Sequence, residues 1–498
     1  MWTQVDSLFS ALLSICVLLT VVTTIVVIVL DNRNPVKTLA WVLVLIFLPV
    51  VGLIVYFFFG QDRRKERLIS KKGYARLTKY PMAGYQQQKE FGCPDEYSQL
   101  IQFFRRVNGS LPFEGNAVQV YTDGYEMMDG LLRAISGAKH HVHLQSYIFE
   151  DDAVGRLVRD ALADKARQGV EVRVLYDDVG CWNVPHQFYD EMLSMGIDVR
   201  PFLKVRFPRF TGKVNYRNHR KVAVVDGIIG FIGGMNIAMR YVKGVSWGDW
   251  RDTHIKLEGK AVYGLQTAFL TDWYATDHSM ISSSKYYPEI SKCGDTLIQI
   301  VTSNPIGKCR NIMQGLLVAI SSARKYLYIQ TPYLMPTEPI LIALKTASQA
   351  GVDVRIMMPQ QADSRLVHYA SLSYIDELME AGVNIYMYNK GFLHAKLLVS
   401  DDMLTTVGST NMDFRSFEHN FEANAFMYDR SLAIRLKNTF LCDQKKRQLH
   451  ILEELEKAFV VSKVFGVCYS FVCSFTLKKE KFTLPYTRRS IKFGLSSK

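Results

Sequence analysis

Histidine, lysine and aspartate occur together twice in this chain, each time as His-x-Lys-x4-Asp. The six positions are His219, Lys221 and Asp226 in the first motif and His394, Lys396 and Asp401 in the second. Each motif is followed by a Gly-rich turn that ends in an asparagine, Asn236 in the first copy and Asn411 in the second. Equivalent residues lie 175 positions apart throughout. One such motif would be weak evidence, because chance supplies it in long proteins, but two in one register indicate a duplicated site.

These residue types suit the chemistry of a phosphate diester. A histidine and a lysine two positions apart on a strand point to the same face, so that an imidazole and an ammonium converge on one place. The asparagine adds an uncharged amide donor for phosphate. If the two copies meet, lysines and amides can hold the non-bridging oxygens, one histidine can attack phosphorus and the other can protonate the leaving alkoxide. Because the lysines supply the positive charge, we expect neither a metal ion nor a cofactor.

The motif aspartates occupy a different position from the histidines and lysines. Asp226 and Asp401 each follow their histidine by seven residues and fall at the end of the predicted strand. That place favours a carboxylate that braces the local turn over one that touches phosphate. We therefore include both in the predicted catalytic motifs but expect a supporting role.

The motifs belong to a longer internal repeat. HVHLQSYIF at 141–149 corresponds to YLYIQTPYL at 326–334, and GVEVRVLYD at 169–177 corresponds to GVDVRIMMP at 351–359. Near-continuous apolar strands alternating with helices predict an α/β fold whose mixed sheets are flanked by helices. The period, about 180 residues, is too long for a solenoid. We therefore expect two similar halves, at 116–285 and 286–445, related by a pseudo-two-fold axis that brings equivalent residues face to face.

The duplicated HxKx4D motif followed by GSxN resembles the phospholipase D superfamily. The longer segments GFLHAK at 391–396, GSTNMDFRSFEHNFEANAF at 408–426 and RNPVKTLAW at 33–41 resemble the bacterial cardiolipin synthases within it. The resemblance runs from the apolar N-terminal segment to about residue 456. It implies two phospholipase D-like halves and phosphatidyl transfer between two phosphatidylglycerol molecules, giving cardiolipin and glycerol through a phosphatidyl-histidine intermediate.

The same resemblance implies roles for single residues. His219, in the first motif, would be the nucleophile, and His394 would be the general acid and then the general base. In this superfamily an acidic residue downstream of each motif orients the histidine. The fitting positions are Asp252 in WRDTH and Glu422, eleven residues after Asn411. A carboxylate there would fix the imidazole tautomer and stabilise its cation.

The N-terminal segment predicts a membrane anchor. One uncharged apolar run covers about 8–30, and a second, at about 39–59, is interrupted only by Pro49 and Gly52. Each is long enough to cross ~30 Å of hydrocarbon as a helix. Together they predict a transmembrane hairpin at 1–60. A cleaved signal peptide is the alternative for the first run, but no basic residue precedes it and a second apolar run follows.

Basic residues gather after the second apolar run, at 61–76, within a predicted linker at 61–115. The positive-inside rule places this end, and the two halves beyond it, on the cytoplasmic side of the cell membrane. The whole chain has a formal net charge of +13, which fits anionic lipids or another anionic partner. Its eight cysteines show no CxxC pair and no regular spacing, which argues against a disulfide framework and a structural zinc site.

A histidine cluster precedes the first motif, at His140, His141 and His143, and alternation puts the last two on one strand face. The matching positions in the second half are Tyr326 and Tyr328. We therefore interpret the histidines as structural residues at the start of a strand, and not as metal ligands.

Two basic segments complete the prediction. The segment at 202–218 is longer than its counterpart in the second half, and we expect it to form a loop at the mouth of the site that meets lipid headgroups. The tail at 446–498 is first apolar and then strongly basic, which favours an amphipathic interfacial segment. A third membrane span and a disordered tail are the alternatives that the sequence leaves open.

Four functions are open on the sequence alone. A cardiolipin-forming transferase and a hydrolytic phospholipase D differ only in whether an alcohol or water accepts the phosphatidyl group. A phosphodiesterase or nuclease would use the same motifs, but the predicted anchor and the lack of a recognisable nucleic-acid module weigh against it. A non-catalytic scaffold would have lost a motif residue, and none is lost. We expect phosphatidylglycerol and anionic membrane lipids as partners, no nucleic acid, and no obligate protein partner.

Overall fold

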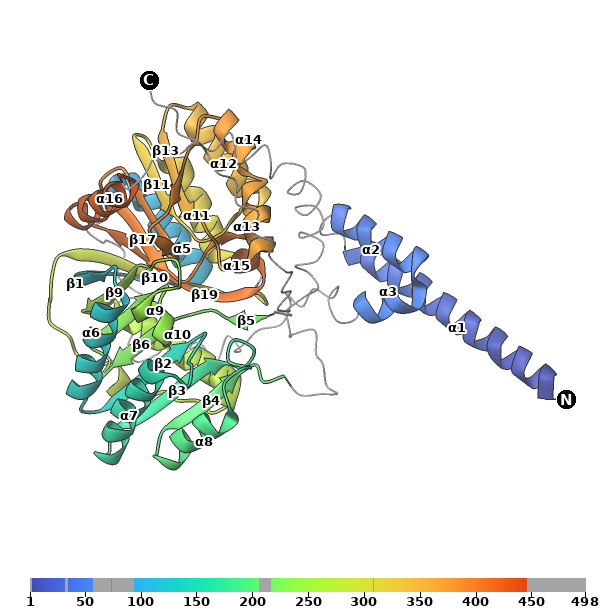
Figure 1. Ribbon diagram of the computed structural model, residues 1–498, viewed down its shortest axis with the longest axis horizontal. Coiled ribbons are helices and arrows are strands. Elements are labelled where there is room, and N and C mark those ends of the chain that lie inside the picture. Colours follow the sequence, from blue (N-terminus) through green and yellow to red (C-terminus); the bar gives the residue numbers. More distant parts are fainter. Residues whose placement is uncertain are drawn as a thin grey trace, which may run out of the picture.

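A large mixed sheet forms the body of the molecule (Figure 1). The computed structural model describes residues 2–31, 35–56, 73, 94–205, 216–307 and 309–445. Within them the sheet has 15 strands, and its centre is an antiparallel pair with one strand from each predicted half. These two strands are β1 (Pro112–Tyr121) and β10 (Thr296–Ser303).

The strands follow the same order on both sides of the β1–β10 pair. Beyond β1 lie β9 (His254–Glu258), β7 (Ile229–Gly233), β6 (Val222–Val225), β2 (His141–Ser146), β3 (Glu171–Asp177) and β4 (Asp198–Phe202). Beyond β10 lie β19 (Asn420–Tyr428), β17 (Leu404–Gly408), β16 (Leu397–Ser400), β11 (Tyr326–Gln330), β13 (Asp353–Pro359) and β14 (Asn384–Tyr388). In each half the outer three strands are parallel and the inner ones antiparallel. This order repeats the duplication seen in the sequence and confirms the α/β class with mixed sheets.

Helices cover both faces of the sheet. On one face, α10 (Val262–Asp277) covers the first half and α16 (Arg430–Gln444) the second, and their buried residues belong to one core that both halves share. On the other face each half has its own core. The helices there are α6 (Gly124–Gly137), α7 (Ala153–Arg167) and α8 (His186–Ser194) in the first half, and α11 (Asn311–Ser322), α12 (Glu338–Gln349), α13 (Arg365–Leu372) and α14 (Ile375–Glu380) in the second. α5 (Ser98–Asn108), from the segment before the first half, packs into the core of the second.

The strands after the two motifs show why the sequence there is apolar without alternation. In β6, Val222 and Val224 lie in the shared core, whereas Ala223 and Val225 lie in the core of the opposite face. Both faces of the strand are therefore removed from water, and every position gains from an apolar side chain. The strand fixes the backbone immediately after the first motif's lysine.

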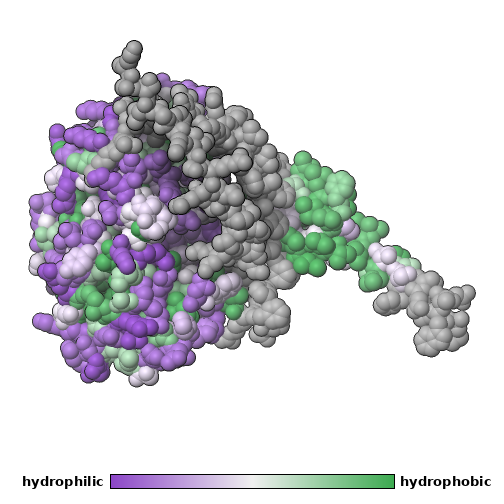
Figure 2. All heavy atoms as spheres, viewed as in Figure 1, coloured by the Kyte–Doolittle hydropathy of each residue, from purple (hydrophilic) through white to green (hydrophobic). Residues whose placement is uncertain are grey.

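The first helices of the described chain are α1 (Trp2–Asp31), α2 (Pro35–Phe47) and α3 (Pro49–Val55). Figure 2 shows that apolar residues gather on these projecting helices, whereas the visible face of the body is mostly hydrophilic. Residues Ser10–Leu30 form a helix that is long and apolar enough to cross a membrane. Among the described residues no second helix meets the same length.

The predicted second span is divided. Its residues form α2 and α3, which meet at Leu48 with φ −132° and ψ 64°. Pro49 is the cause, because its ring and its missing N–H disfavour helical backbone at the preceding residue. Both short helices pack against α1, through a small cluster that contains Val21, Ile28 and Leu45. A hairpin of two full-length spanning helices is therefore not what the structure describes.

Several predictions fall outside the described residues. They concern the basic cluster at 61–76, apart from Gly73, most of the predicted headgroup loop, at 206–215, and the tail from 446 onward.

Candidate functional site

A short strand that crosses between the halves places the first histidine. β5 (Arg217–Asn218) pairs in parallel with Asn420 and Phe421 at the start of β19, which belongs to the second half. His219 follows directly, and its backbone N–H donates to Phe421 O at 3.0 Å. The residue after Phe421 is Glu422, so the histidine and this carboxylate leave the strand pair side by side.

The second histidine is placed in the same way with the halves reversed. β15 (Gly391–Leu393) pairs in parallel with β8 (Asp249–Arg251), a strand of the first half. His394 follows β15 and donates its backbone N–H to Arg251 O at 2.7 Å. Asp252 comes next after β8. The backbone therefore delivers each histidine beside an acid from the opposite half.

The side chains complete these two pairs. His219 Nδ1 lies 3.0 Å from Glu422 Oε1 and 3.2 Å from Oε2. His394 Nδ1 lies 2.6 Å from Asp252 Oδ2. Both carboxylates are completely buried. The structure thus brings each predicted orienting acid to a motif histidine, and it assigns Glu422 to the first motif and Asp252 to the second.

Burial and charge set the protonation of these pairs. Burial lowers the pKa of His219 to about 4 and that of His394 to about 3. Burial alone would raise the pKa of Glu422 and Asp252, but the histidines and lysines beside them outweigh it, and both pKa values lie below their ordinary range. At neutral pH the imidazoles are therefore neutral and the acids ionised. A neutral ring that donates Nδ1–H to a carboxylate presents a lone pair at Nε2, the form that a nucleophile or base requires.

Both motif lysines lie in the same buried centre. Lys221 Nζ donates to His219 O at 2.6 Å, and Lys396 Nζ donates to His394 O. Burial lowers the pKa of Lys221 well below its ordinary value and that of Lys396 to about 8, while Glu422 and Asp252 act in the opposite direction. An anion bound between the two ammonium groups would raise both pKa values and would itself be stabilised.

The two asparagines are less alike than their motifs predict. Asn236 Oδ1 accepts from Ile148 N at 3.0 Å, and its Nδ2 donates to the Tyr241 hydroxyl. Asn411 Oδ1 is buried without a hydrogen bond among the described residues, while its backbone N–H donates to Ser416 Oγ at 3.3 Å. The Asn236 amide thus joins its turn to the segment that follows β2 and to the Tyr241 side chain. Contact with phosphate stays a prediction for both.

The motif aspartates lie at the outer ends of their strands. Asp226 accepts from the backbone N–H groups of residues 139, 140 and 141 at 2.7–2.9 Å. Asp401 accepts from those of residues 324, 325 and 326 over the same distances. Both adopt a left-handed backbone, with φ of 53° and 52°. Each carboxylate joins its turn to the start of a neighbouring strand through three hydrogen bonds, so these contacts are structural.

Aromatic rings that sequence reasoning missed surround the imidazoles. The Tyr147 ring meets His219 edge to face with centroids 5.0 Å apart. The Trp250 ring lies 5.2 Å from that of His394. Duplication gave no signal for either ring, because the repeat matches Tyr147 with Pro332. Trp250 could have been noticed only through its place two residues before the predicted acid.

Two histidines of the cluster before the first motif belong to the core. His141 Nε2 lies 3.0 Å from Gln266 Oε1, and His143 Nδ1 lies 2.8 Å from Gln266 Nε2. Their rings are 4.6 Å apart, as expected for one strand face. The described residues contain no group of three or more His, Cys, Asp or Glu side chains that could hold a metal ion.

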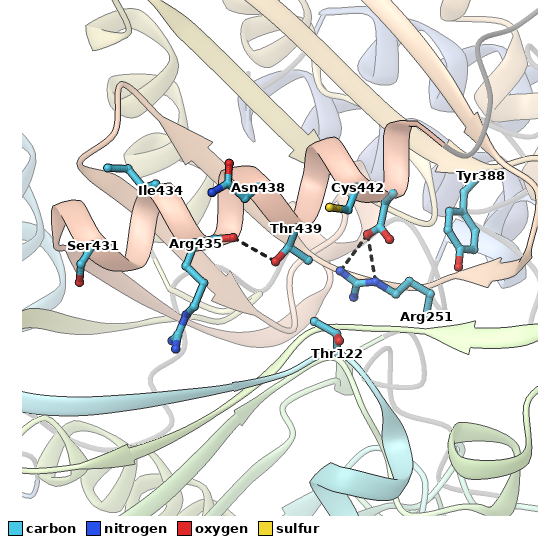
Figure 3. A pocket seen from close by; sticks show the side chains of 10 residues that line it. Thr122, Arg251, Tyr388, Ser431, Ile434, Arg435, Asn438, Thr439 and Cys442 are labelled. Carbon is cyan, nitrogen blue, oxygen red and sulfur yellow. Dashed lines mark hydrogen bonds and ion pairs between the residues drawn. The ribbon is translucent and has the colours of Figure 1, made fainter.

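A cavity of about 630 Å³ lies near the histidines but outside their pairs. Its lining residues are Thr122, Arg251, Tyr388, Ser431, Ile434, Arg435, Asn438, Thr439, Cys442 and Asp443. Figure 3 shows Arg251 beneath the helix that carries Ser431 to Cys442. The Nε atom of Arg251 lies 3.0 Å from Asp443 Oδ2. No motif residue lines this cavity. It touches the site only through Arg251, whose carbonyl accepts the His394 N–H.

Comparisons with known proteins identify the family of the chain. The family model "Cardiolipin synthase, PLD-like domain" matches residues 131–261 and 316–443, and "Phospholipase D-nuclease N-terminal" matches 18–61. The chain is 39% identical to the major cardiolipin synthase ClsA of Bacillus subtilis over 87% of its own length and 92% of that protein. It is 40% identical to cardiolipin synthase 2 of Bacillus cereus over 85% of its length and 84% of that protein.

A solved structure supports the fold. The phosphatidylserine synthase of Haemophilus influenzae superposes with a TM-score of 0.56 over 75% of this chain and 99% of that one, at 14% identity. This likeness concerns the arrangement of the chain and not its substrate. With both halves matched by one family model and relatives aligned over most of their length, the chain belongs to the cardiolipin synthase family of proteins with phospholipase D-like domains.

Proposed function

We propose that this protein is a membrane-associated phosphatidyltransferase that makes cardiolipin and glycerol from two molecules of phosphatidylglycerol. The observation that carries the chemistry is the pair of neutral histidines, His394 buried and His219 largely buried, each hydrogen-bonded through Nδ1 to an ionised acid of the opposite half. Membership of the cardiolipin synthase family supports the substrate.

In the first step of this proposal, His219 Nε2 attacks the phosphorus of one phosphatidylglycerol. A P–N bond forms, the P–O bond to the terminal glycerol breaks, and His394 gives a proton to the departing oxygen. His394 can carry that proton because a bound phosphate places negative charge beside it and raises its pKa from the value of the empty site. Lys221 and Lys396 stabilise the charge on the non-bridging oxygens, and the asparagine amides add donors.

In the second step the acceptor arrives. His394 Nε2 removes the proton from a glycerol hydroxyl of another phosphatidylglycerol, and that oxygen attacks phosphorus. The P–N bond breaks and His219 returns to its neutral form. Glu422 and Asp252 keep the two rings in the tautomer that both steps need and stabilise each transient imidazolium.

Hydrolysis is the second candidate, because water could replace the acceptor without any change in the first step. The deciding assay incubates purified protein in mixed vesicles with headgroup- and acyl-labelled phosphatidylglycerol. We expect labelled cardiolipin and free glycerol in equal amounts. Phosphatidic acid without cardiolipin would refute the transferase assignment while leaving the phosphodiester chemistry intact.

The order of the histidines has its own assay. After brief incubation with acyl-labelled substrate, denaturation at alkaline pH should preserve a phosphatidyl-histidine, and peptide mapping should place it at His219. The variant His394→Ala should still form some of it, whereas His219→Ala should not. The opposite pattern would exchange the two roles.

We further propose that the N-terminal 60 residues span the membrane twice and leave the body in the cytoplasm. The apolar helix Ser10–Leu30 and the match of 18–61 to the N-terminal family model support membrane association. The packing of α2 and α3 on α1 supports a return of the chain toward its starting side. Protease accessibility in right-side-out and inside-out vesicles tests the orientation: the body should be cleaved only in the inside-out preparation.

A further inference from the structure

A buried arginine contacts the backbone carbonyl of the acid in each histidine–acid pair. The two arginines occupy positions that do not correspond in the repeat. We propose that Arg220 and Arg251 are positioning residues with the same role, although the positions that they occupy do not correspond in the repeat. Each holds the backbone carbonyl of an orienting acid and neutralises a buried aspartate behind it. The inference rests on the proposed function, because the acids that are held are Glu422 and Asp252.

Arg220 forms the first of two clusters. Its Nε donates to Glu422 O at 3.0 Å and its Nη2 donates to Ser303 O at 3.1 Å. Its Nη1 donates to Asp272 Oδ2 at 2.6 Å, and the same oxygen accepts from Gln145 Nε2 at 2.6 Å. Asp272 lies on α10 and is completely buried. One guanidinium thus links the helix of the first half to the strand that carries the acid of His219.

Arg251 forms the second cluster. Its Nη1 donates to Asp252 O and lies 3.2 Å from Thr253 Oγ1. Its Nε and Nη2 both lie 3.0 Å from Asp443 Oδ2, which also accepts from Gln330 Nε2 at 3.0 Å. Asp443 lies on α16. The guanidinium therefore links the helix of the second half to the backbone of the acid that holds His394.

The partners of the arginines match in the repeat, but the arginines do not. Gln145 corresponds to Gln330, and the two aspartates lie on the helices that cover the two halves on the same face. Arg220 stands between the histidine and the lysine of its motif, where the second motif has Ala395. Arg251 directly precedes its acid, where the other acid is preceded by Phe421.

Each cluster therefore contains one arginine, within the motif in the first half and before the acid in the second. The matching position without arginine is Phe421 in the first half and Ala395 in the second. Behind the first pair Arg220 stacks with its guanidinium 5.8 Å from the centroid of the Phe421 ring. In the second half the position that matches Arg220 is Ala395, and Arg251 lines the cavity of about 630 Å³ (Figure 3). A cluster without its guanidinium would leave a buried carboxylate unpaired, which is strongly unfavourable. Only an arginine offers the fixed fork that reaches a carboxylate and a carbonyl together.

Exchanging the two positions in the second half tests the proposal. The variants are Arg251→Phe, Ala395→Arg and the two combined, which together rebuild the arrangement of the first half. Arg251→Phe should lower kcat/KM by about 100-fold through a displaced Asp252, because small misplacements of reacting groups cost about that much. The double variant should recover to within an order of magnitude of the unchanged protein, a coupling that independent residues would not show.

The readouts separate positioning from mere stability. Total phosphatidyl release, whether it yields cardiolipin or phosphatidic acid, is measured against pH, together with thermal unfolding of the detergent-purified full chain. Phosphatidyl release by the single variant should need a more acidic pH if Asp252 no longer holds His394, because this carboxylate raises the pKa of the ring that protonates the leaving oxygen, and the double variant should restore the profile. Recovered thermal stability without recovered kcat/KM would refute the positioning role. A double variant no better than the worse single one would refute the exchange.

Two controls keep the outcome decisive. Arg251→Lys retains a charge but not the forked guanidinium. Its kcat/KM should therefore lie closer to that of Arg251→Phe than to that of the unchanged protein. Arg435→Phe changes an exposed arginine on the same cavity and should leave kcat/KM unaltered.

If the second-half variants do not fold, the reciprocal pair Arg220→Ala and Phe421→Arg asks the same question in the first half, and failure of both combined variants refutes the exchange. Loss of cardiolipin with phosphatidyl release intact would count against the proposed acceptor and not against the arginines.

Discussion

The two halves share a backbone plan but support their histidines differently. In the first pair, Glu422 accepts from the Ser409 hydroxyl as well as from Asn420 Nδ2 at 3.1 Å. In the second pair, Asp252 accepts from Thr253 N at 2.7 Å.

The residue that matches Ser409 in the first half is Gly234. A Cβ at Gly234 would lie 2.1 Å from Asp252 Oδ1. The carboxylate of the shorter acid thus fills the space that the serine side chain takes in the other half. The two halves therefore share their strands but differ in the side chains that support each acid.

The largest expected effect comes from neutralising the two acids. Glu422→Gln and Asp252→Asn should each lower kcat by about 10²–10⁴-fold, because an amide no longer fixes the tautomer or stabilises the imidazolium. The comparison predicts different failures. Glu422→Gln should abolish the covalent intermediate at His219, whereas Asp252→Asn should slow both proton transfers and leave some intermediate detectable.

Rapid quench of acyl-labelled substrate measures both variants. The matched control is Glu258→Gln, an acid on β9 that pairs with Lys256 at the surface, which should leave the rate unchanged. Identical loss of the intermediate in both acid variants would show that the halves are not divided in function.

The lowered pKa of the motif lysine Lys396 predicts an upper pH limit for kcat/KM. The pKa of Lys396 is lowered to about 8 in the empty site, so above that pH the free protein loses the Lys396 charge, which attracts phosphate. We expect kcat/KM to fall about tenfold for each pH unit well beyond this point. Lys396→Arg should extend the plateau to higher pH at a reduced maximum rate, since a guanidinium stays charged. An unchanged limit in that variant would assign the limit to another group.

The motif aspartates should affect stability more than chemistry. Asp226→Ala removes the acceptor of three backbone N–H groups, of which that of His141 is buried. It should cost about 2–4 kcal/mol of unfolding free energy. Asp401→Ala should cost less, because two of its three donors are exposed. Denaturant unfolding in detergent measures both. A loss of kcat/KM at full stability would instead place these carboxylates at the phosphate.

The smallest effect is expected at Ser409. Ser409→Ala removes one of the hydrogen bonds to Glu422, and we expect a fall in kcat of about threefold to tenfold with little change in thermal stability. The fall should vanish in a Glu422→Gln background, because the serine acts through that carboxylate. An undiminished effect there would assign the hydroxyl a separate contact.

Fold class and motif residues could be predicted because the signal was redundant. Strands such as β6 are buried on both faces, so their sequences are apolar throughout, and each motif had a copy to confirm it. The assignment of Glu422 to His219 could not be predicted. It depends on β5, which has two residues and therefore no periodicity, and on pairing across about 200 positions of sequence.

The division of the second apolar run was open to prediction in part. Pro49 was visible, but a proline also begins helices well, and only the backbone at Leu48 shows that one helix ends there. The exchanged arginines had no signal, because a repeat is recognised by what it keeps in register. The partners of Arg220 and Arg251 correspond in the repeat, but the two arginines do not.

The crossed origin of the histidine–acid pairs makes the molecule resemble a symmetric dimer fused into one chain. Neither half owns a complete pair, since His219 depends on a carboxylate contributed after residue 420 and His394 on one contributed before residue 253. A severed half would therefore be inert rather than half as active, and complementation would require both pieces to reassemble the shared core beneath α10 and α16. Loss of either half would therefore remove one histidine together with the acid that orients the other.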